Sequence, residues 1–308
     1  MTHVKFTPTL LHPKYWLTWL VIGVWWLTVN LLPFSWQLRI GRWLGALLYR
    51  YAKSRRHIAS RNIEACLPEL PDAEREALVR RCIEETAIGV IESGAAWFWP
   101  NWRFRGKYQV NGIKHIENAL EKNKGVLFLG VHFTTIEIGA AIVNLEFPIS
   151  GFYRPHTNAV YEYVQAIGRI RRNKLSTVIP NGDVRGIVKA LRLGTVINYA
   201  PDQDYGKRRS VFAPFFGIEA ATVKAPSQLA SAGRAEIIPW TTRRDHESHR
   251  YIIDIHPPIT QNMNIGEYED AVTINNFVEE QVRKNPEQYL WVHRRFKTRP
   301  EGEDGIYN

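Results

Sequence analysis

His132 and Glu137 are the residues whose types and spacing suggest chemistry. His132 follows a continuous apolar run, residues 125–131, which is typical of a strand buried within a parallel sheet. Thr134 or Thr135 is placed to cap a helix that begins just beyond the histidine, and this helix carries Glu137 near its start. Open α/β sheets hold their ligands at the carboxyl ends of the strands, so we expect both side chains at such a site.

The spacing of His132 and Glu137 limits how the two side chains meet. On one continuous helix they would point about 140° apart, because each residue turns the helix by about 100°. With His132 in the turn before the helix, the Glu137 carboxylate reaches back to one imidazole nitrogen. It then fixes the tautomer, and the other nitrogen takes a substrate proton as a general base. The alternative is a histidine that bonds the backbone at the strand end, with Glu137 in solvent.

Composition points to a folded, basic protein with anionic partners. The chain has 308 residues, of which 45% are hydrophobic, and 40 Lys and Arg against 30 Asp and Glu leave a net charge of +10. A chain of this length buries a full-sized core. Its charge favours binding to phosphate-bearing lipid, a membrane surface, an acidic protein or nucleic acid.

Several other chemistries lack the residues they need. There is no glycine-rich phosphate loop and no Gly-x-Ser-x-Gly nucleophile motif. Cys66 and Cys82 belong to no CxxC or Cys/His cluster, and His246 and His249 lie in a polar run that is typical of a hairpin loop. We therefore expect no metal and no cofactor, and direct transfer to a substrate hydroxyl activated by His132 remains.

The amino-terminal segment, residues 1–38, is expected to anchor the protein to a membrane. Residues 15–38 contain no charge and 16–32 are almost wholly apolar, close to the about 20 residues that a membrane span needs. Basic residues are more frequent after this segment than before it, which places the catalytic domain, residues 39–308, in the cytoplasm. The alternative is an interfacial helix that lies on anionic lipid without crossing the bilayer.

From residue 107 onward, strand-like and helical patterns alternate. This alternation predicts an α/β fold with a largely parallel mixed sheet flanked by helices. The strand-like runs are residues 125–131, 149–153, 177–179 and 195–200, and the helical runs are 135–145, 159–172 and 184–193. Residues 235–241 and 251–255 add strands, with an antiparallel edge as one option, and 267–284 form a closing helix.

Polar and basic clusters follow these strands and helices. Taken singly, each cluster is typical of a solvated loop. Together with His132 and Glu137, they suggest a rim of cations around one base, which suits a substrate with several phosphates. The candidates are Arg154; Arg169, Arg171, Asn173 and Lys174; Asp202, Asp204 and Tyr205; and Arg294 and Arg295.

Five blocks of this chain resemble the signature blocks of the late acyltransferases of lipid A biosynthesis, especially the lauroyltransferase branch. The blocks are GVHFTTIEIGA, GFYRP, GRIRRNK, YAPDQDYG and PEQYLWVHRRFKTRPEG. The segments LHPKYWLTWL and AWFWP are also similar to that branch, so the resemblance covers nearly the whole chain. It implies a fold like that of the glycerolipid acyltransferases, although this chain lacks their Glu-Gly-Thr-Arg block and has Glu137 where they mostly carry Asp.

The resemblance implies an activity and a location. The enzyme would transfer a fatty acyl group, laurate in this branch, from acyl carrier protein to a hydroxyl of a hydroxyacyl chain on Kdo2-lipid IVA. It would sit in the bacterial inner membrane as a single-pass protein with its catalytic domain on the cytoplasmic face, in contact with anionic membrane lipid. Acyl carrier protein would be a co-substrate, and neither a cofactor nor nucleic acid is implied.

The resemblance also implies roles for particular residues. The family's base and its carboxylate partner correspond to His132 and Glu137, and its essential Arg and Asp correspond to Arg169 and Asp202. Arg154 matches the second block, where a role in binding phosphate or an oxyanion is expected. No covalent acyl-enzyme is required, because His132 activates the acceptor hydroxyl directly.

Two other functions stay open on the sequence. A glycerolipid acyltransferase would acylate lysophosphatidate and leave Kdo2-lipid IVA unchanged. A membrane-tethered protein without catalytic activity would bind anionic lipid or nucleic acid, as the charge of +10 allows, and its DNA binding would weaken with salt.

Overall fold

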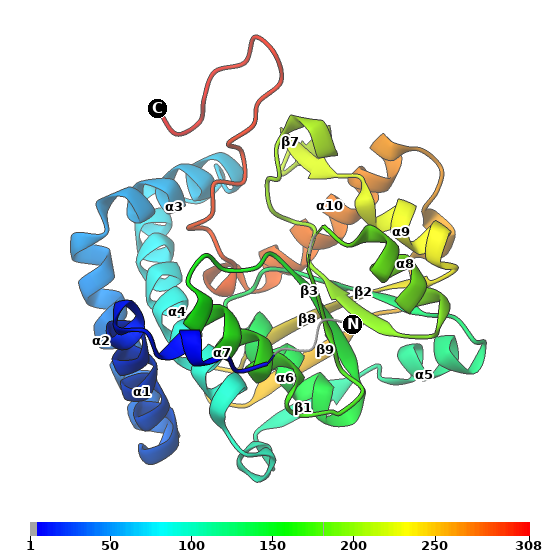
Figure 1. The fold of residues 1–308 in the computed structure, drawn as a ribbon. Helices are drawn as coiled ribbons and strands as arrows, with labels where there is room; N and C mark the ends of the chain where they lie inside the picture. The colour runs from blue at the N-terminus through cyan, green and yellow to red at the C-terminus, as the bar shows by residue number, and fades with distance from the viewer. Residues whose placement is uncertain (1–4, 181) are drawn as a thin grey trace.

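A seven-stranded sheet forms the centre of the computed structural model, which describes residues 5–180 and 182–308. Its strand order is β1-β9-β8-β2-β5-β3-β4, and Figure 1 shows helices packed around it. The sheet strands are β1 (Tyr108–Asn111), β2 (Val126–Gly130), β3 (Ile149–Tyr153), β4 (Val178–Pro180), β5 (Val196–Tyr199), β8 (Glu236–Arg244) and β9 (Tyr251–Ile255). The helices are α1 (Trp16–Leu31), α2 (Phe34–Tyr51), α3 (Lys53–Cys66), α4 (Asp72–Phe98), α5 (Lys114–Glu121), α6 (Ile136–Glu146), α7 (Ala159–Ile170), α8 (Val184–Arg192), α9 (Ala225–Gly233) and α10 (Glu267–Lys284).

Strand directions confirm the predicted mixed, largely parallel sheet. The five neighbouring strands β8, β2, β5, β3 and β4 are parallel. Strand β9 runs antiparallel to β8, and β1 runs parallel to β9. The antiparallel pair therefore lies inside the sheet rather than at its edge. All of β2 through α8 alternates as predicted, with boundaries within two residues of those expected.

Strand β2 is buried on both faces, which explains its continuous apolar sequence. Leu127 and Leu129 pack into a core formed with α3, α8, α9 and α10. Val126 and Phe128 point to the opposite face, where α6, α7 and the second half of α4 cover the sheet. Because successive strand residues alternate between faces, one strand serves both cores.

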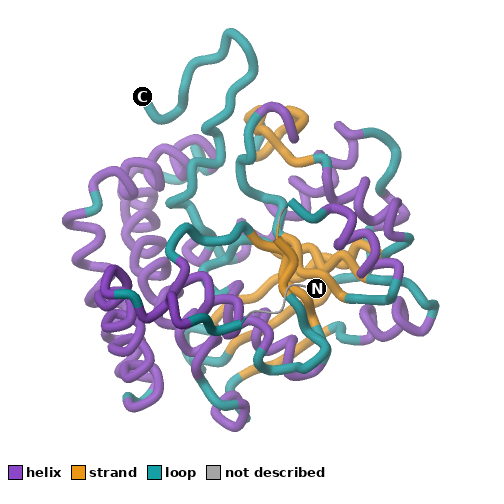
Figure 2. The backbone as a smooth tube through the Cα atoms, viewed as in Figure 1, coloured by secondary structure: helices purple, strands orange, loops and turns teal. Residues whose placement is uncertain are grey.

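A second, two-stranded sheet was not predicted from the sequence. It consists of β6 (Ser210–Phe215) and β7 (Ile218–Val223), which pair antiparallel and pack on α10. Phe216 and Gly217 join them with φ values of 52° and 75°, as in the tight turns that match the twist of a hairpin. Figure 2 shows this small sheet apart from the central one.

The amino-terminal segment differs from the single anchor that we expected. Pro33 divides it into α1, of 16 residues, and α2, of 18 residues, so the expected boundary between residues 38 and 39 falls inside α2. Within residues 5–180 and 182–308, no helix is both long and apolar enough to cross a membrane. Helix α1 packs on α4 and α7, and Figure 1 shows α1 to α4 side by side at one end of the sheet.

Candidate active site

His132 and Asp202 form the central pair of the candidate site. His132 follows β2 and Asp202 follows β5, and these two strands are neighbours in the sheet. The His132 Nδ1 atom lies 2.5 Å from Asp202 Oδ1, and the His132 backbone N–H donates to Asp202 Oδ2 at 3.0 Å. One buried carboxylate therefore holds the ring and the backbone of the histidine together.

The electrostatics of Asp202 favour its charged form. Burial raises the pKa of this carboxyl, but the charge of the His132 ring and the two hydrogen bonds from His132 outweigh burial, so the pKa of Asp202 lies below its ordinary value. An ionised carboxylate accepts a hydrogen bond from the Nδ1–H of the imidazole. The other ring nitrogen, Nε2, is then left with a lone pair that accepts a proton.

Glu137 is not the partner of the imidazole, which corrects the expected pairing. Its carboxylate accepts from Arg169 Nε at 2.9 Å and from Trp97 Nε1 at 2.8 Å, and Arg169 Nη2 also bonds it. These donors from α7 and α4 occupy both carboxylate oxygens. Burial raises the pKa of Glu137, but the charge and hydrogen bonds of Arg169 prevail and lower the pKa below its ordinary value.

A cavity of about 180 Å³ joins the two pairs. His132, Glu137 and Arg169 all line it, so the two predicted catalytic residues share a cavity although they do not bond each other. The rest of the lining is mostly apolar and comes from α4, α6, β3, α7 and β5: Trp97, Ile136, Ala140, Ala141, Ile149, Gly151, Phe152, Gly168, Asn198 and Ala200. The cavity combines an imidazole, a guanidinium and a mostly apolar wall, a combination that is typical of a small-molecule binding site.

Asn198 is a cavity residue that the sequence analysis missed. It lies on β5, and its Oδ1 accepts a hydrogen bond from Trp240 Nε1 at 3.1 Å. Within the described residues its Nδ2 has no hydrogen-bond partner, so the N–H groups of this amide are available to a ligand in the cavity. A polar residue in the otherwise apolar run of β5 was the available signal.

The carboxyl-terminal segment fixes the loop that carries His132. Leu290 N–H donates to the His132 carbonyl at 3.0 Å, Thr134 N–H donates to the Gln288 carbonyl at 2.8 Å, and Phe133 pairs with Tyr289 in an antiparallel bridge. The sequence analysis had expected cations from this segment rather than backbone support.

His293, in the same segment, is a second histidine close to the site. Its Nε2 accepts a hydrogen bond from the backbone N–H of Asp204 at 3.3 Å. Burial, together with the nearby charge of His132, lowers the pKa of His293 to about 4. His293 is therefore neutral near pH 7.

Several expected substrate-binding residues have structural partners instead. Arg171 Nη1 donates to the Trp97 carbonyl at 2.8 Å, at the carboxyl end of α4. Asn173 caps a turn through Leu175 N–H, and Asp204 accepts from Thr298 N–H at 2.6 Å and from Gly206 N–H. Arg295 is 3% exposed and donates to the Ala221 carbonyl at 2.7 Å. Asp204 and Arg295 are buried and Asn173 is partly buried, whereas Arg171 is exposed although it bonds the Trp97 carbonyl.

The other four expected substrate-binding residues are exposed. Arg154 follows β3, Lys174 lies in the turn after α7, Tyr205 precedes Gly206, and Arg294 belongs to the carboxyl-terminal segment. None of the four lines the cavity. In the described part of the chain, no group of three or more His, Cys, Asp or Glu side chains is arranged to hold a metal ion.

Comparisons with known proteins agree with the motifs. The family model described as bacterial lipid A biosynthesis acyltransferase matches residues 3–298. A lipid A biosynthesis lauroyltransferase of Escherichia coli (strain K12) is 41% identical over 98% of this chain and 98% of its own. A lipid A biosynthesis palmitoleoyltransferase of the same strain is 39% identical over the same shares. A myristoyltransferase of that strain is 28% identical over 97% of this chain and 92% of its own.

These matches extend over nearly the whole chain, and they include the strands and loops that carry His132, Glu137, Arg169 and Asp202. The resemblance inferred from the sequence blocks is confirmed. The chain is an acyltransferase that belongs to the bacterial lipid A biosynthesis acyltransferase family, on its lauroyltransferase branch.

Proposed function

We propose that this enzyme transfers an acyl group, preferentially laurate, from acyl carrier protein to a hydroxyl of a hydroxyacyl chain on Kdo2-lipid IVA. The observation that carries the proposal is the His132–Asp202 pair, whose histidine lines a mostly apolar cavity. The 41% identical relative is a lipid A biosynthesis lauroyltransferase, which supports laurate, and the net charge of +10 suits an acidic carrier protein and a phosphorylated acceptor.

The proposed mechanism is general-base catalysis by His132. Asp202 accepts a hydrogen bond from Nδ1–H and so orients the ring, and Nε2 takes the proton of the acceptor hydroxyl as the hydroxyl oxygen attacks the thioester carbon. The tetrahedral intermediate then collapses: the carbon–sulfur bond breaks, and the proton on Nε2 passes to the departing thiolate. The products are an ester and a free thiol, and no acyl-enzyme forms.

Asn198 and Arg169 are the donors proposed for the anionic oxygen of the intermediate. Both line the cavity, and each is held in place: Trp240 fixes the Asn198 amide, and Glu137 fixes the Arg169 guanidinium. Pre-oriented donors stabilise developing charge more than mobile ones, since they need no reorganisation during the reaction. Glu137 is therefore proposed to act through Arg169 rather than through the imidazole.

Helices α1 and α2 are proposed to bind the inner membrane from its cytoplasmic side, either across the bilayer or along its interface. The apolar side chains of Leu17, Leu20 and Val24 on α1 are more than half exposed. Arg39 and Arg42, in the first half of α2, are also exposed, and such cations bind anionic headgroups. An exposed apolar helix flanked by cations is typical of a membrane-binding surface.

Mass spectrometry of the acceptor lipid tests the proposed reaction. Purified enzyme is incubated with Kdo2-lipid IVA and acyl carrier protein thioesters that include laurate and palmitoleate. One added laurate, at a rate above that of the other chains and of the coenzyme A thioester, is expected. Preference for another acyl chain contradicts the proposed use of laurate. Equal rates with the coenzyme A thioester contradict the proposed dependence on acyl carrier protein. Acylation of lysophosphatidate with an unchanged Kdo2-lipid IVA assigns the enzyme to glycerolipid synthesis instead.

Binding to vesicles tests the membrane surface. Wild-type protein is expected to sediment with phosphatidylglycerol vesicles, whereas Leu17→Glu with Leu20→Glu reduces binding. The matched control is Val184→Glu, which adds a charge at a 55% exposed apolar residue on α8. Equal vesicle binding by the double variant and the control contradicts the role of α1.

A further inference from the structure

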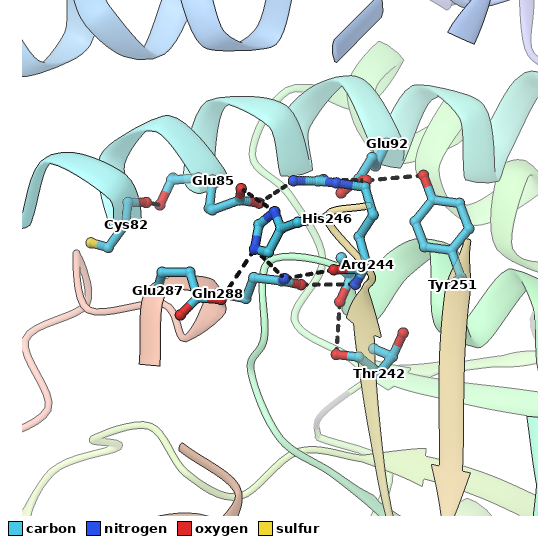
Figure 3. Close-up of polar contacts among 11 residues, drawn as sticks. Cys82, Glu85, Glu92, Thr242, Arg244, His246, Tyr251, Glu287 and Gln288 are labelled. Atoms are coloured by element: carbon cyan, nitrogen blue, oxygen red, sulfur yellow. Dashed lines mark hydrogen bonds and ion pairs between the residues drawn. The ribbon is translucent and has the colours of Figure 1, made fainter. Parts of the chain in front are cut away.

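A buried ion group lies behind the His132 loop, outside the cavity. Arg244, at the end of β8, donates through Nη1 to Glu92 Oε1 at 2.6 Å and through Nη2 to Glu85 Oε2 at 2.5 Å. Tyr251 on β9 donates to the same Glu92 oxygen at 2.9 Å. Figure 3 shows these side chains between α4 and the two strands, with the Arg244 guanidinium between the two carboxylates.

This group fixes the backbone of Arg244. The side chains of Arg244 and Glu92 are both 1% exposed, and removing water from charged groups costs several kcal/mol per ion unless good bonds replace it. Burial, followed by the charge of Glu92, raises the pKa of Glu85, and the charge of Arg244 opposes both. The half-exposed His246 places its Nδ1 atom 3.9 Å from Glu85 Oε1. The guanidinium therefore cannot move without leaving a buried carboxylate unpaired.

Gln288 connects the fixed Arg244 backbone to the His132 loop. Its side chain accepts from Arg244 N–H at 2.9 Å and donates to the Arg244 carbonyl at 2.8 Å. Its backbone carbonyl accepts from Thr134 N–H at 2.8 Å. Two residues later, Leu290 N–H bonds the His132 carbonyl at 3.0 Å. One residue thus bonds the ion group with its side chain and the loop with its backbone.

The opposite side of the loop has little freedom. A Cβ atom at Gly89 of α4 would lie only 2.6 Å from the Thr134 carbonyl oxygen, so the helix backbone touches the loop. Thr135 Oγ1 donates to the Thr242 carbonyl of β8 at 2.8 Å. The loop is held between α4, β8 and the segment that contains Gln288. The segment that contains Gln288 is thus one of the three supports of the loop that carries His132.

We infer that Gln288 is a positioning residue for acyl transfer, which sets the place of His132 through Thr134 and Leu290 and is itself anchored by the Glu85–Arg244–Glu92 group. Gln288 does not line the cavity. The inference rests on the proposed role of His132 as the base. Productive geometry requires the reacting groups to be held closely, and a misplacement of about 1 Å costs about 100-fold in rate.

Steady-state kinetics of Gln288→Ala in the full-length enzyme test the inference. We expect kcat to fall by about 10- to 100-fold while the KM for each substrate changes by less than about twofold. Asn275→Ala is the matched control, because Asn275 is another buried amide, 1% exposed, that donates to the Pro214 carbonyl at 2.9 Å and lies on α10. It is expected to lose similar stability and to keep its kcat.

A spectroscopic measurement separates positioning from general loosening of the fold. In proton NMR, the Nδ1–H of a histidine bonded to a carboxylate gives a far-downfield signal, and His132→Ala identifies the signal of His132. We expect this signal to weaken or move in Gln288→Ala and to stay in Asn275→Ala. If Gln288→Ala does not fold, Gln288→Glu is measured in its place. Its carboxylate still accepts from the Arg244 N–H but cannot donate to the Arg244 carbonyl.

The outcomes distinguish this inference from the proposed function. A kcat of Gln288→Ala within twofold of wild type, or an equal loss in both variants, overturns the positioning role. Retained turnover in His132→Ala overturns the proposed mechanism itself, whatever Gln288 does. A loss of kcat in the Gln288 variants but not in Asn275→Ala, together with a changed His132 signal, supports both the positioning role of Gln288 and the proposed mechanism.

Discussion

Asp202 bonds His132 at two points, since one carboxylate oxygen lies 2.5 Å from the ring Nδ1 and the other accepts the backbone N–H at 3.0 Å. This arrangement leaves Nε2 as the nitrogen that exchanges protons with substrate. The two carboxylates near the cavity therefore have different partners: Asp202 bonds His132, whereas Glu137 bonds Arg169 and Trp97.

Asp202→Asn is expected to lower kcat by about 1,000-fold or more while the fold is retained. An amide of the same size donates to Nδ1 when its N–H faces the ring, which moves the ring proton to Nε2 and removes the base. The measurement is single-turnover acyl transfer, with circular dichroism to check folding. Asp254→Asn is the control, since Asp254 pairs with Arg243 outside the cavity. Near-normal turnover in Asp202→Asn would contradict the proposed pair.

Glu137→Gln is expected to lower kcat by less than Asp202→Asn does, by about 10- to 100-fold. The substitution keeps a hydrogen-bond acceptor but removes the charge that holds the Arg169 guanidinium at the cavity. Arg169→Ala is expected to cause a similar loss, and the double variant is expected to be little worse than either single variant, because the two residues act together. If Glu137→Gln is as inactive as His132→Ala, then Glu137 acts on the imidazole, as the sequence first suggested.

The strands and helices that carry the candidate site could be predicted, because the local pattern of apolar and polar residues determines them. Strand β2 is apolar throughout, and α10 shows helical periodicity, so the bounds of α10 were predicted without error. The places of His132 and Asp202 at strand ends followed from these elements. Their pairing did not follow, because β5 lies between β2 and β3 in the sheet although it comes later in the chain.

Contacts between distant segments explain what the sequence did not predict. The hairpin β6–β7 was hidden because Pro214 lies inside a strand and Phe216 occupies a positive-φ turn position that Asn, Asp or Gly usually fills. Gln288 gains its role only where α4, β8 and the carboxyl-terminal segment meet. Arg295 belonged to an expected basic rim, but its burial beside Ala221 depends on the unpredicted hairpin.

Asn198→Ala is expected to lower kcat by about 100-fold and to leave the KM for the acyl donor nearly unchanged. Its free amide hydrogen is proposed to bond the oxyanion, which exists only in the transition state and the intermediate, so the loss belongs in kcat. The control is Asn111→Ala, because Asn111 bonds Asp254 at 2.7 Å away from the cavity. A rise in KM without a change in kcat would show that Asn198 binds the ground state instead.

The lowered pKa of His293 predicts how the free energy of unfolding depends on pH. Its pKa is lowered to about 4 in the folded protein, chiefly by burial, whereas the unfolded chain has a histidine pKa of about 6.5. Between pH 4 and pH 6.5 this histidine is therefore protonated more often in the unfolded chain than in the folded protein. The free energy of unfolding decreases as the pH falls below about 6.5. The loss is expected to reach about 1–2 kcal/mol between pH 7 and pH 5.

His293→Gln keeps an acceptor for Asp204 N–H but does not titrate, so its stability should fall less over this range. Urea unfolding at both pH values measures the difference, with His12→Gln, at an exposed histidine, as the control. An equal loss in His293→Gln and wild type would show that His293 does not carry this dependence.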